Sequence, residues 1–373
     1  MNKKIVHVII GLHIGGAELM LKRLVLSSNK KEEFQHTVIS LMDLGVIGPD
    51  LQKQGVEVYS LGMRSALSIP KIFLRLRQLL KKLNPDVVQT WMYHADFLGG
   101  LAAKSIGVKN IIWGIRTTDV SQGSSKITVH LSKLCAKLSY HVPTTIVCAA
   151  HVAKDYHVGI GYDESKMTVI ANGYEIDALT ATDADGLDIR QQHGISADDI
   201  VIGSVGRFNP VKNQKLFVDV AAILVKDYPN IKFMMVGRDN TAENKELLSW
   251  IEDYGLTDNF RLLGERGDVP KCLKAMDVFC LHSKTEGFPN VVVEAILLNV
   301  FTIATDVGEV ARLIPEEQIV SVDKNDYSTK LQHVLSSECF RDKEKLNALK
   351  ESSIAKYSIA NIVLEHESIY EKI

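Results

Sequence analysis

Two glutamates eight residues apart frame the segment of this chain that is best suited to chemistry. Glu286 precedes a short turn, and Glu294 lies in the apolar run after it. The turn itself consists of Gly287, Phe288, Pro289 and Asn290. Proline is tolerated where a helix starts, and a helix start offers free N–H groups and a partial positive charge. Such donors beside two carboxylates suit a polyhydroxylated anion, and a nucleotide sugar fits that description.

A pair of basic residues follows the strand that we expect at 200–206. Arg207 and Lys212 are five residues apart, across a turn that contains Pro210 and opens a helix. Arginine presents a planar fork to phosphate oxygens, and lysine presents a compact point charge. The two side chains can therefore converge on one diphosphate. The plainer interpretation is a solvated loop with incidental charges.

A glycine-rich loop at 11–18 follows the first expected strand and opens a helix. Gly15 and Gly16 would let backbone N–H groups approach an anion closely, although a tight turn without a ligand is the alternative. The spacing matches neither the dinucleotide fingerprint nor a Walker A loop, so neither NAD nor ATP is indicated. His94 comes just after the strand expected at 86–91, where a side chain reaches the ligand-binding edge of a sheet. A structural histidine is the alternative there.

Residues 286–294 resemble the Glu-x7-Glu motif of the retaining glycosyltransferases of family 4, which have the GT-B fold. The resemblance implies that Arg207 and Lys212 hold the donor pyrophosphate and that His94 contacts the donor sugar. It also implies that Glu294 accepts the ribose hydroxyls and that Glu286 holds the sugar. The implied catalytic residues are therefore Glu286, His94, Arg207 and Lys212. The implied substrate-binding residues are Gly15, Gly16, Arg207, Lys212, Glu286, Gly287, Phe288, Pro289, Asn290 and Glu294.

Two positions depart from the family pattern, which often has glycine at both. Asn299 stands before the strand expected at 301–305, and asparagine can adopt the left-handed backbone conformation. Glu309 follows Gly308. A carboxylate there would repel a diphosphate if it pointed inward.

Short apolar runs alternate with helical patterns along the chain, which is typical of parallel α/β units. We predict an α/β protein of GT-B type, with two doubly wound Rossmann-like domains that face each other across a cleft. The expected strands are 5–10, 36–42, 56–61, 86–91, 111–115, 145–149 and 167–171, then 200–206, 231–237, 260–263, 278–282, 301–305 and 319–322. The expected domains are 1–175 and 200–357, with a linker at 176–199. The resemblance implies that an amphipathic helix at 358–373 packs back on the first domain.

The composition is that of a globular protein of two domains, with 373 residues, 46% hydrophobic and 24% charged. Residues 1–170 carry 21 basic and 12 acidic side chains, whereas the remainder carries 22 and 33. The first half could therefore sit on an anionic surface. Five scattered cysteines form no pairing pattern, which indicates reduced thiols in the cytoplasm. No apolar run is long enough to span a membrane.

We expect no cofactor and no metal ion. Asp183 and Asp185 formally match the Asp-x-Asp motif of metal-dependent transferases, but no strand precedes them. No group of histidines and cysteines has zinc spacing. Arg207, Lys212 and helix N-termini would instead neutralise the leaving diphosphate.

A helix expected at 70–83 is apolar on one face and basic elsewhere. Its basic residues are Lys71, Arg75, Arg77, Lys81 and Lys82. A helix packed on its own sheet with a solvated basic side is one interpretation, and reversible contact with an anionic membrane is the other. Both can hold at once. We therefore expect a cytoplasmic protein with peripheral contact at the inner face of the membrane, and no nucleic-acid partner.

The expected function is transfer of a sugar from a nucleoside-diphosphate donor, taken as a UDP-sugar, with retention at the anomeric carbon. The acceptor would be a glycan or lipid-linked saccharide in the synthesis of a bacterial surface polysaccharide such as lipopolysaccharide. The alternatives are a GT-B sugar-nucleotide 2-epimerase and a non-catalytic GT-B module that binds sugars. The sequence leaves open the donor base and sugar, the acceptor, the linkage and the oligomeric state.

Overall fold

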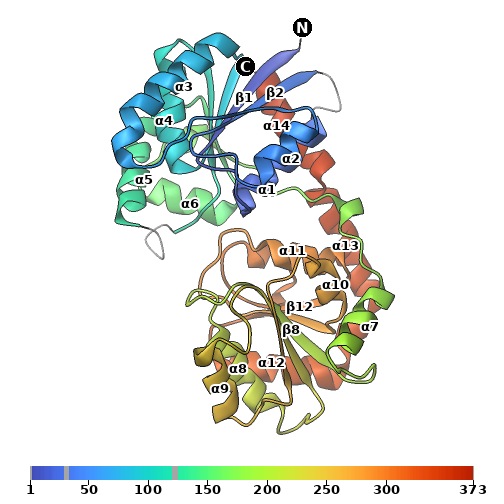
Figure 1. Cartoon of the computed structure of the whole chain (residues 1–373). Helices are drawn as coiled ribbons and strands as arrows, with labels where there is room; N and C mark the ends of the chain where they lie inside the picture. Colours follow the sequence, from blue (N-terminus) through green and yellow to red (C-terminus); the bar gives the residue numbers. More distant parts are fainter. Residues whose placement is uncertain (1, 29–32, 120–124, 373) are drawn as a thin grey trace. The chain divides into compact units, whose positions relative to one another are not determined.

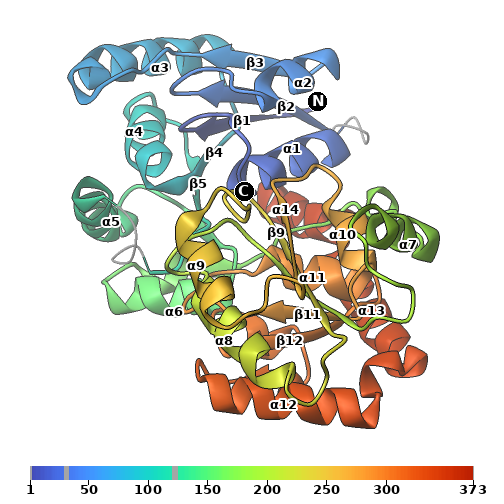
Figure 2. The same ribbon diagram turned by 60° about the horizontal axis from the view of Figure 1, so that its bottom comes forward.

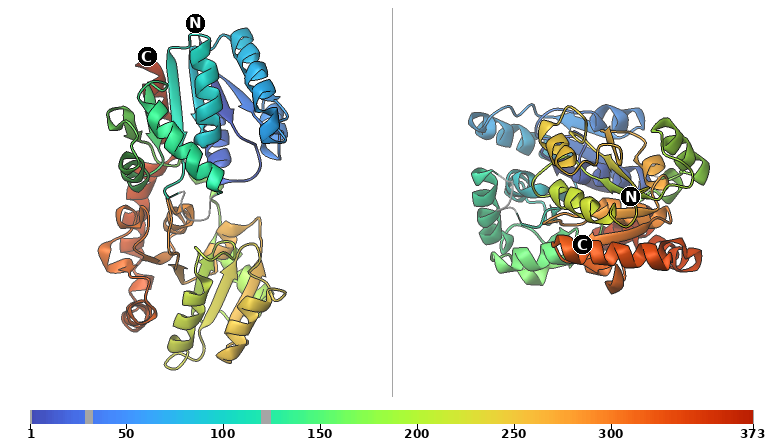
Figure 3. Two further views of the ribbon diagram at one scale, coloured as in Figure 1. Left: turned by 90° about the vertical axis from the view of Figure 1, so that its left-hand side faces the viewer. Right: turned by 90° about the horizontal axis from the view of Figure 1, so that it is seen from below.

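A computed structural model describes residues 2–28, 33–119 and 125–372, which divide into two compact units. Unit 1 comprises residues 1–175 together with 357–373, and unit 2 comprises residues 176–356. Each unit is a parallel sheet with helices on both faces (Figure 1; Figure 3). Both termini therefore belong to the same unit.

Unit 1 holds a seven-stranded sheet in the order β3-β2-β1-β4-β5-β6-β7. Its strands are β1 (Lys3–Ile9), β2 (Phe34–Ser40), β3 (Glu57–Ser60), β4 (Val87–Trp91), β5 (Asn110–Ile115), β6 (Thr145–Cys148) and β7 (Met167–Val169). Its helices are α1 (Gly16–Ser28), α2 (Ile47–Lys53), α3 (Ile69–Leu83), α4 (Met92–Ser105), α5 (Lys126–Ser139), α6 (His151–Gly159) and α14 (Ile359–Glu371).

Unit 2 holds a six-stranded sheet in the order β10-β9-β8-β11-β12-β13. Its strands are β8 (Val201–Val205), β9 (Lys232–Val236), β10 (Phe260–Gly264), β11 (Val278–Leu281), β12 (Phe301–Thr305) and β13 (Ile319–Val320). Its helices are α7 (Asp183–Gln192), α8 (Gln214–Leu224), α9 (Lys245–Asp253), α10 (Val269–Lys274), α11 (Asn290–Leu297), α12 (Lys324–Ser337) and α13 (Lys343–Tyr357), the last of which ends at the unit boundary.

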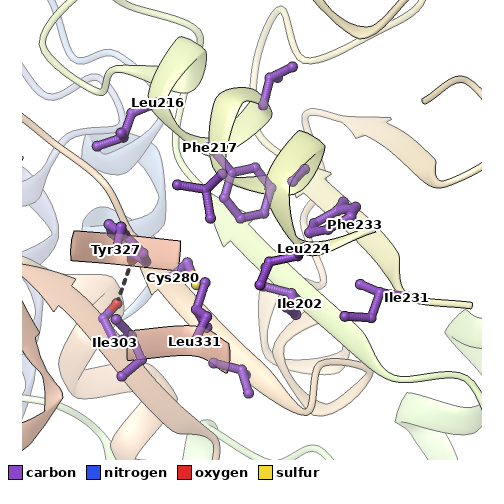
Figure 4. Close-up of a cluster of buried hydrophobic side chains, with 14 of the residues drawn as sticks. Ile202, Leu216, Phe217, Leu224, Ile231, Phe233, Cys280, Ile303, Tyr327 and Leu331 are labelled. Atoms are coloured by element: carbon purple, nitrogen blue, oxygen red, sulfur yellow. Dashed lines mark hydrogen bonds between the residues drawn. The ribbon is translucent and has the colours of Figure 1, made fainter. Parts of the chain in front are cut away.

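Every strand expected from the sequence is present, with ends that differ by up to two residues. The prediction holds because these strands are covered on both faces and read as continuous apolar runs. In unit 2, Phe217 of α8 stacks edge-on against Phe233 of β9, and Leu224 packs in the same cluster (Figure 4). In the same cluster the hydroxyl of Tyr327 of α12 donates to the backbone oxygen of Ile303, 3.0 Å away (Figure 4).

The expected linker at 176–199 is wrong, because these residues belong to unit 2. Thr182 caps α7 through a capping box with Asp185, and α7 packs against α10. Arg190 is buried and donates to the backbone oxygen of Ala275 at 2.8 Å and to Asp277 at 2.8 Å. The polar composition suggested a free linker, but the acidic residues serve as a cap and as partners of basic side chains on α10.

The C-terminal helix α14 packs beside α1 in unit 1 (Figure 2). Its residues Ile362, Val363 and Tyr370 join the core under β1 and β2. Beyond these apolar contacts, a buried chain of hydrogen bonds reaches the helix. The helix is thus held by a polar network as well as by apolar burial.

The first donor in this series of hydrogen bonds determines which atom donates in each of the bonds that follow. The indole N–H of Trp91 can only donate, and it lies 3.2 Å from Nδ1 of His7, so the His7 proton is on Nε2. That nitrogen donates to Nδ1 of His36 at 2.8 Å, and Nε2 of His36 donates to the hydroxyl of Ser28 at 3.0 Å. Ser28 in turn donates to Glu367 of α14 at 2.8 Å. Both histidines are therefore neutral.

We predict that unit 1 loses stability as the pH falls below about 6.5. Burial lowers the pKa of His36 to about 4 and that of His7 well below its usual value, so the unfolded chain binds more protons in this range. One such histidine costs about 1.4 kcal/mol of unfolding free energy per pH unit between its two pKa values. Denaturant unfolding at pH 7.5 and 5.5 measures this. Replacing His36 with Gln should remove about 1.4 kcal/mol of the stability loss between these two pH values, whereas the exposed His333→Gln control should leave the loss unchanged.

Candidate functional site

The loop between β11 and α11 places Glu286 against Lys212. Lys212 Nζ lies 2.6 Å from Oε1 of Glu286, and the hydroxyl of Ser283 donates to the same oxygen at 2.6 Å. The carboxylate side chain is 12% exposed and the lysine side chain 27%, so the pair is partly shielded from water. The sequence placed these residues on different loops, and the structure brings them into direct contact.

The loop that carries Lys212 is tied to the end of β11 by backbone contacts. The N–H of Lys284 donates to the oxygen of Val211 at 2.8 Å, and Nδ1 of His282 donates to the oxygen of Lys212 at 2.6 Å. At its other end the loop is held by Gln214, whose Nε2 donates to the oxygen of Arg207 at 2.8 Å. The side chain of Arg207 is exposed. The cation and the carboxylate therefore share one rigid platform.

The segment Glu286–Gly287 rests closely on the loop after β12. Gly308 has a φ of +59°, and a side chain there would come within 2.4 Å of the backbone oxygen of Gly287. The N–H of Glu309 donates to that oxygen at 3.1 Å. Glu309 is 4% exposed and pairs with Arg312 at 3.2 Å, so its charge is compensated by a cation.

The remaining residues of the motif lie where α11 begins. Phe288 and Pro289 lead into the helix, Asn290 is its first residue, and Glu294 is half-buried about one turn further in. Asn299, two residues after the end of this helix, has a φ of +57°, as its tolerance of the left-handed region allows.

The candidate residues of unit 1 lie at the carboxyl ends of β1 and β4. Gly15 precedes α1 and Gly16 is its first residue, and a side chain at Gly15 would come within 2.4 Å of Oε2 of Glu18. The Glu18 carboxyl group thus lies over the loop, and burial raises its pKa. An anion at this loop would meet that carboxyl group as well as the N–H groups.

His94 lies in the first turn of α4 and is half-buried. Burial lowers its pKa, which favours a neutral imidazole that can hydrogen-bond to a hydroxyl group. Its neighbour Tyr93 is buried, with its hydroxyl 2.7 Å from Nε2 of His157 and 2.8 Å from Thr117. Tyr93 therefore has a structural role, and His94 is the more accessible of the two residues.

Asp183 and Asp185 have cationic partners. Lys274 lies 2.6 Å from Asp183, and Lys271 lies 2.7 Å from Asp185. Within the described ranges, no cluster of three or more acidic, histidine or cysteine side chains is arranged as a metal site.

His282 is the residue that the sequence argument missed. It is 4% exposed, and burial lowers its pKa to about 4. Because Nδ1 donates to the oxygen of Lys212, Nε2 accepts from the hydroxyl of Ser204, 2.6 Å away. A histidine at the carboxyl end of a strand was the signal that selected His94, and His282 carried the same signal.

Two family models match the chain. The model described as "Glycosyltransferase Family 4" matches residues 14–178, and "Glycosyl transferases group 1" matches residues 186–355. Together they span most of the sequence, one in each unit. The chain belongs to the family 4-type glycosyltransferases, and its two Rossmann-like sheets form the GT-B fold.

Relatives with glycosyltransferase names agree with this assignment. The chain is 28% identical to the capsular polysaccharide biosynthesis glycosyltransferase CapH of Staphylococcus aureus over 82% of each chain. It is 29% identical to an Escherichia coli enzyme named UDP-Gal:alpha-D-GlcNAc-diphosphoundecaprenol alpha-1,3-galactosyltransferase, over 60% of this chain and 59% of that one. Among solved structures, Anabaena Alr3699/HepE in complex with UDP superposes with a TM-score of 0.86 at 18% identity, covering 99% of this chain and 100% of that one.

We predict that two amide replacements of His282 differ in their effect on binding of a nucleoside diphosphate. His282→Asn keeps a donor near the position of Nδ1 and so keeps the bond to Lys212. His282→Gln keeps a polar group near Nε2 and loses that bond, which leaves a buried carbonyl unpaired at a cost of about 1–3 kcal/mol. Calorimetry with UDP should show near wild-type affinity for the Asn variant and weaker affinity for the Gln variant. Equal affinities would mean that His282 does not position Lys212.

Proposed function

We propose that this glycosyltransferase moves a hexose from a UDP-sugar to a saccharide or lipid-linked saccharide acceptor, with retention and without a metal ion. The contact between Lys212 and Glu286 carries the proposal, because it joins a phosphate-binding cation to a carboxylate that can hold a sugar. Relatives named for polysaccharide synthesis, and the solved complexes with UDP and UDP-glucose, support the donor class and a role in surface polysaccharide synthesis.

Under this proposal each candidate site residue has a role in binding the donor or the acceptor. Arg207 and Lys212 bind the diphosphate and stabilise the charge that develops on it as the glycosidic bond breaks. Glu294 accepts the ribose hydroxyls, and Glu286 with the backbone of residues 287–290 holds the sugar. His94 binds the sugar, and the loop at Gly15 and Gly16 binds the acceptor. The leaving phosphate takes the acceptor proton on the face from which the acceptor attacks.

We infer from the contact between Lys212 and Glu286 how the donor changes the site when it binds. The diphosphate competes with Glu286 for the ammonium group of Lys212, which releases a carboxylate oxygen toward the sugar. Cationic side chains and the N–H groups at the start of α11 supply the charge that a metal would otherwise supply. Turnover should therefore persist in excess EDTA.

We predict that substitutions of Glu294 and Glu286 have different effects on the affinity for UDP. Glu294→Gln should weaken UDP about 10- to 100-fold, because it removes a charge-assisted hydrogen bond worth roughly 1.5–3 kcal/mol. Glu286→Gln should leave UDP affinity equal or tighter, because Lys212 loses its competing partner, while turnover of the UDP-sugar falls. Calorimetry and a donor-hydrolysis assay measure the two effects, with the exposed Glu344→Gln as control. If Glu286→Gln loses more UDP affinity than Glu294→Gln, the assignment of roles is wrong.

A second part of the proposal is peripheral contact with an anionic membrane through the stretch 58–85. This stretch has six basic residues and no acidic one. Helix α3 buries Ile72, Leu76 and Leu80, while Leu74 is 57% exposed and Leu67 just before the helix is 93% exposed. None of the helices in the described part of the chain has the length and apolar character needed to cross a bilayer.

We predict that vesicles with anionic lipid retain the protein and neutral vesicles do not. A lysine near an anionic surface contributes about 1 kcal/mol, so the double variant Lys81→Gln, Lys82→Gln should bind roughly 30-fold more weakly. The double variant Lys324→Gln, Lys350→Gln has the same net charge and should bind like the wild type. Co-sedimentation at two salt concentrations measures this. Equal losses for both variants would indicate a general charge effect and contradict the proposal.

A further inference from the structure

A hollow of about 600 Å³ lies at the amino end of the sheet in unit 2. Phe301, the first residue of β12, lines it, and so does Gln318, which directly precedes β13. Glu286 and Lys212 instead follow the carboxyl ends of β11 and β8. The hollow and the proposed donor site therefore lie at opposite ends of the same parallel strands.

The walls of the hollow are mainly apolar. Phe301 is 8% exposed and Val334 of α12 is 2% exposed, and they meet Leu346 and Leu349 of α13 across the hollow. The two leucines stay half-buried, although a packed helix normally buries its apolar face fully. The volume lies within the ~300–1,000 Å³ that is typical of small-molecule sites. Helix α13 therefore leaves space for an apolar ligand group.

Basic side chains from two helices stand at this hollow. Lys330 and His333 lie one turn apart on α12, and Lys345 lies on α13. In the described residues no carboxylate forms an ion pair with Lys330, and the only carboxylate paired with Lys345 is that of Asp342, 3.8 Å away. An exposed pair of that kind contributes little. The acidic residue in the lining, Glu317, is exposed and forms no ion pair with either lysine in the described part of the chain, and Asp326 of α12 interacts with Lys330 without forming an ion pair.

A buried amide completes the polar part of the lining. Gln318 is 9% exposed, and its side-chain oxygen has no hydrogen-bond partner in the described structure. An unpaired buried polar atom is costly, so a ligand group that pairs with it would gain affinity. The amide can accept from a hydroxyl or, turned about its last bond, donate to a carboxylate.

We propose that this hollow binds a single-chain anionic amphiphile. Its alkyl chain lies against Phe301, Val334 and the leucines of α13, and its anionic head pairs with Lys330 and Lys345. A sugar or diphosphate would leave the apolar walls unused, and a neutral hydrocarbon would leave the cations unused. The site is independent of the donor site and does not rest on the proposed function.

The thiol of a cysteine in the hollow can be used to measure ligand binding there in the wild-type protein. Cys339 lines the hollow and is half-exposed, whereas Cys135, Cys148, Cys272 and Cys280 are buried. Laurate below its micellar concentration should slow the reaction of Cys339 with an aromatic disulfide reagent. Each methylene buried tightens binding about fourfold, so laurate should protect at roughly fifteenfold lower concentration than decanoate. Protection that does not depend on chain length overturns the proposal.

Two sets of variants distinguish the contribution of the alkyl chain to laurate binding from that of the anionic head group. Ala348 is exposed and lines the hollow, so Ala348→Trp should fill it and weaken laurate at least tenfold. The double variant Lys330→Gln, Lys345→Gln should weaken laurate about tenfold and remove its salt dependence, while Lys350→Gln should match the wild type. Unchanged laurate affinity in Ala348→Trp, with an unchanged thermal midpoint, overturns the proposal. If that variant does not fold, the comparison of laurate with decanoate on the wild-type chain decides.

Discussion

The contact between Lys212 and Glu286 is the interaction on which the proposed chemistry depends, and it exists because two loops are tied together behind it. A partly buried charge needs a partner, since removing it from water is costly. Lys212 satisfies that need through Glu286, and Ser283 adds a second donor to the same oxygen. The bonds from Lys284 to Val211 and from His282 to Lys212 fix the backbone of both loops. The backbone of both loops is therefore preorganised, and only side chains need to move when the proposed donor binds.

Most of the fold was predictable because local sequence and tertiary burial agree in parallel sheets. A strand covered on both faces reads as an apolar run, and its ends are marked by glycine or polar residues. The linker prediction failed because composition alone decided it. The acidic residues around Asp183 and Asp185 look like a solvated segment, yet they cap α7 and pair with Lys274 and Lys271.

The candidate site was predictable in its residue types and not in its pairings. The Arg207 and Lys212 spacing and the two glutamates could be read from the chain. That Lys212 meets Glu286, and that His282 holds the Lys212 backbone, depends on β8 and β11 being neighbours in the sheet. Strand order is a tertiary property, and one sequence does not state it. Such pairings are visible only once the order is known.

The same constraint, that buried polar groups must be paired, has a different consequence in each unit. In unit 1 the chain from Trp91 through His7 and His36 to Ser28 ends on Glu367, so the position of α14 is fixed by a donor direction as well as by apolar packing. A polar network of this kind is satisfied in one register only and disfavours alternative dockings of the helix. In unit 2 the pairing of Lys212 with Glu286 lies at the carboxyl end of the sheet, where the proposed donor would compete for it. Over the hollow, α13 presents half-buried leucines, which the proposed amphiphile would cover.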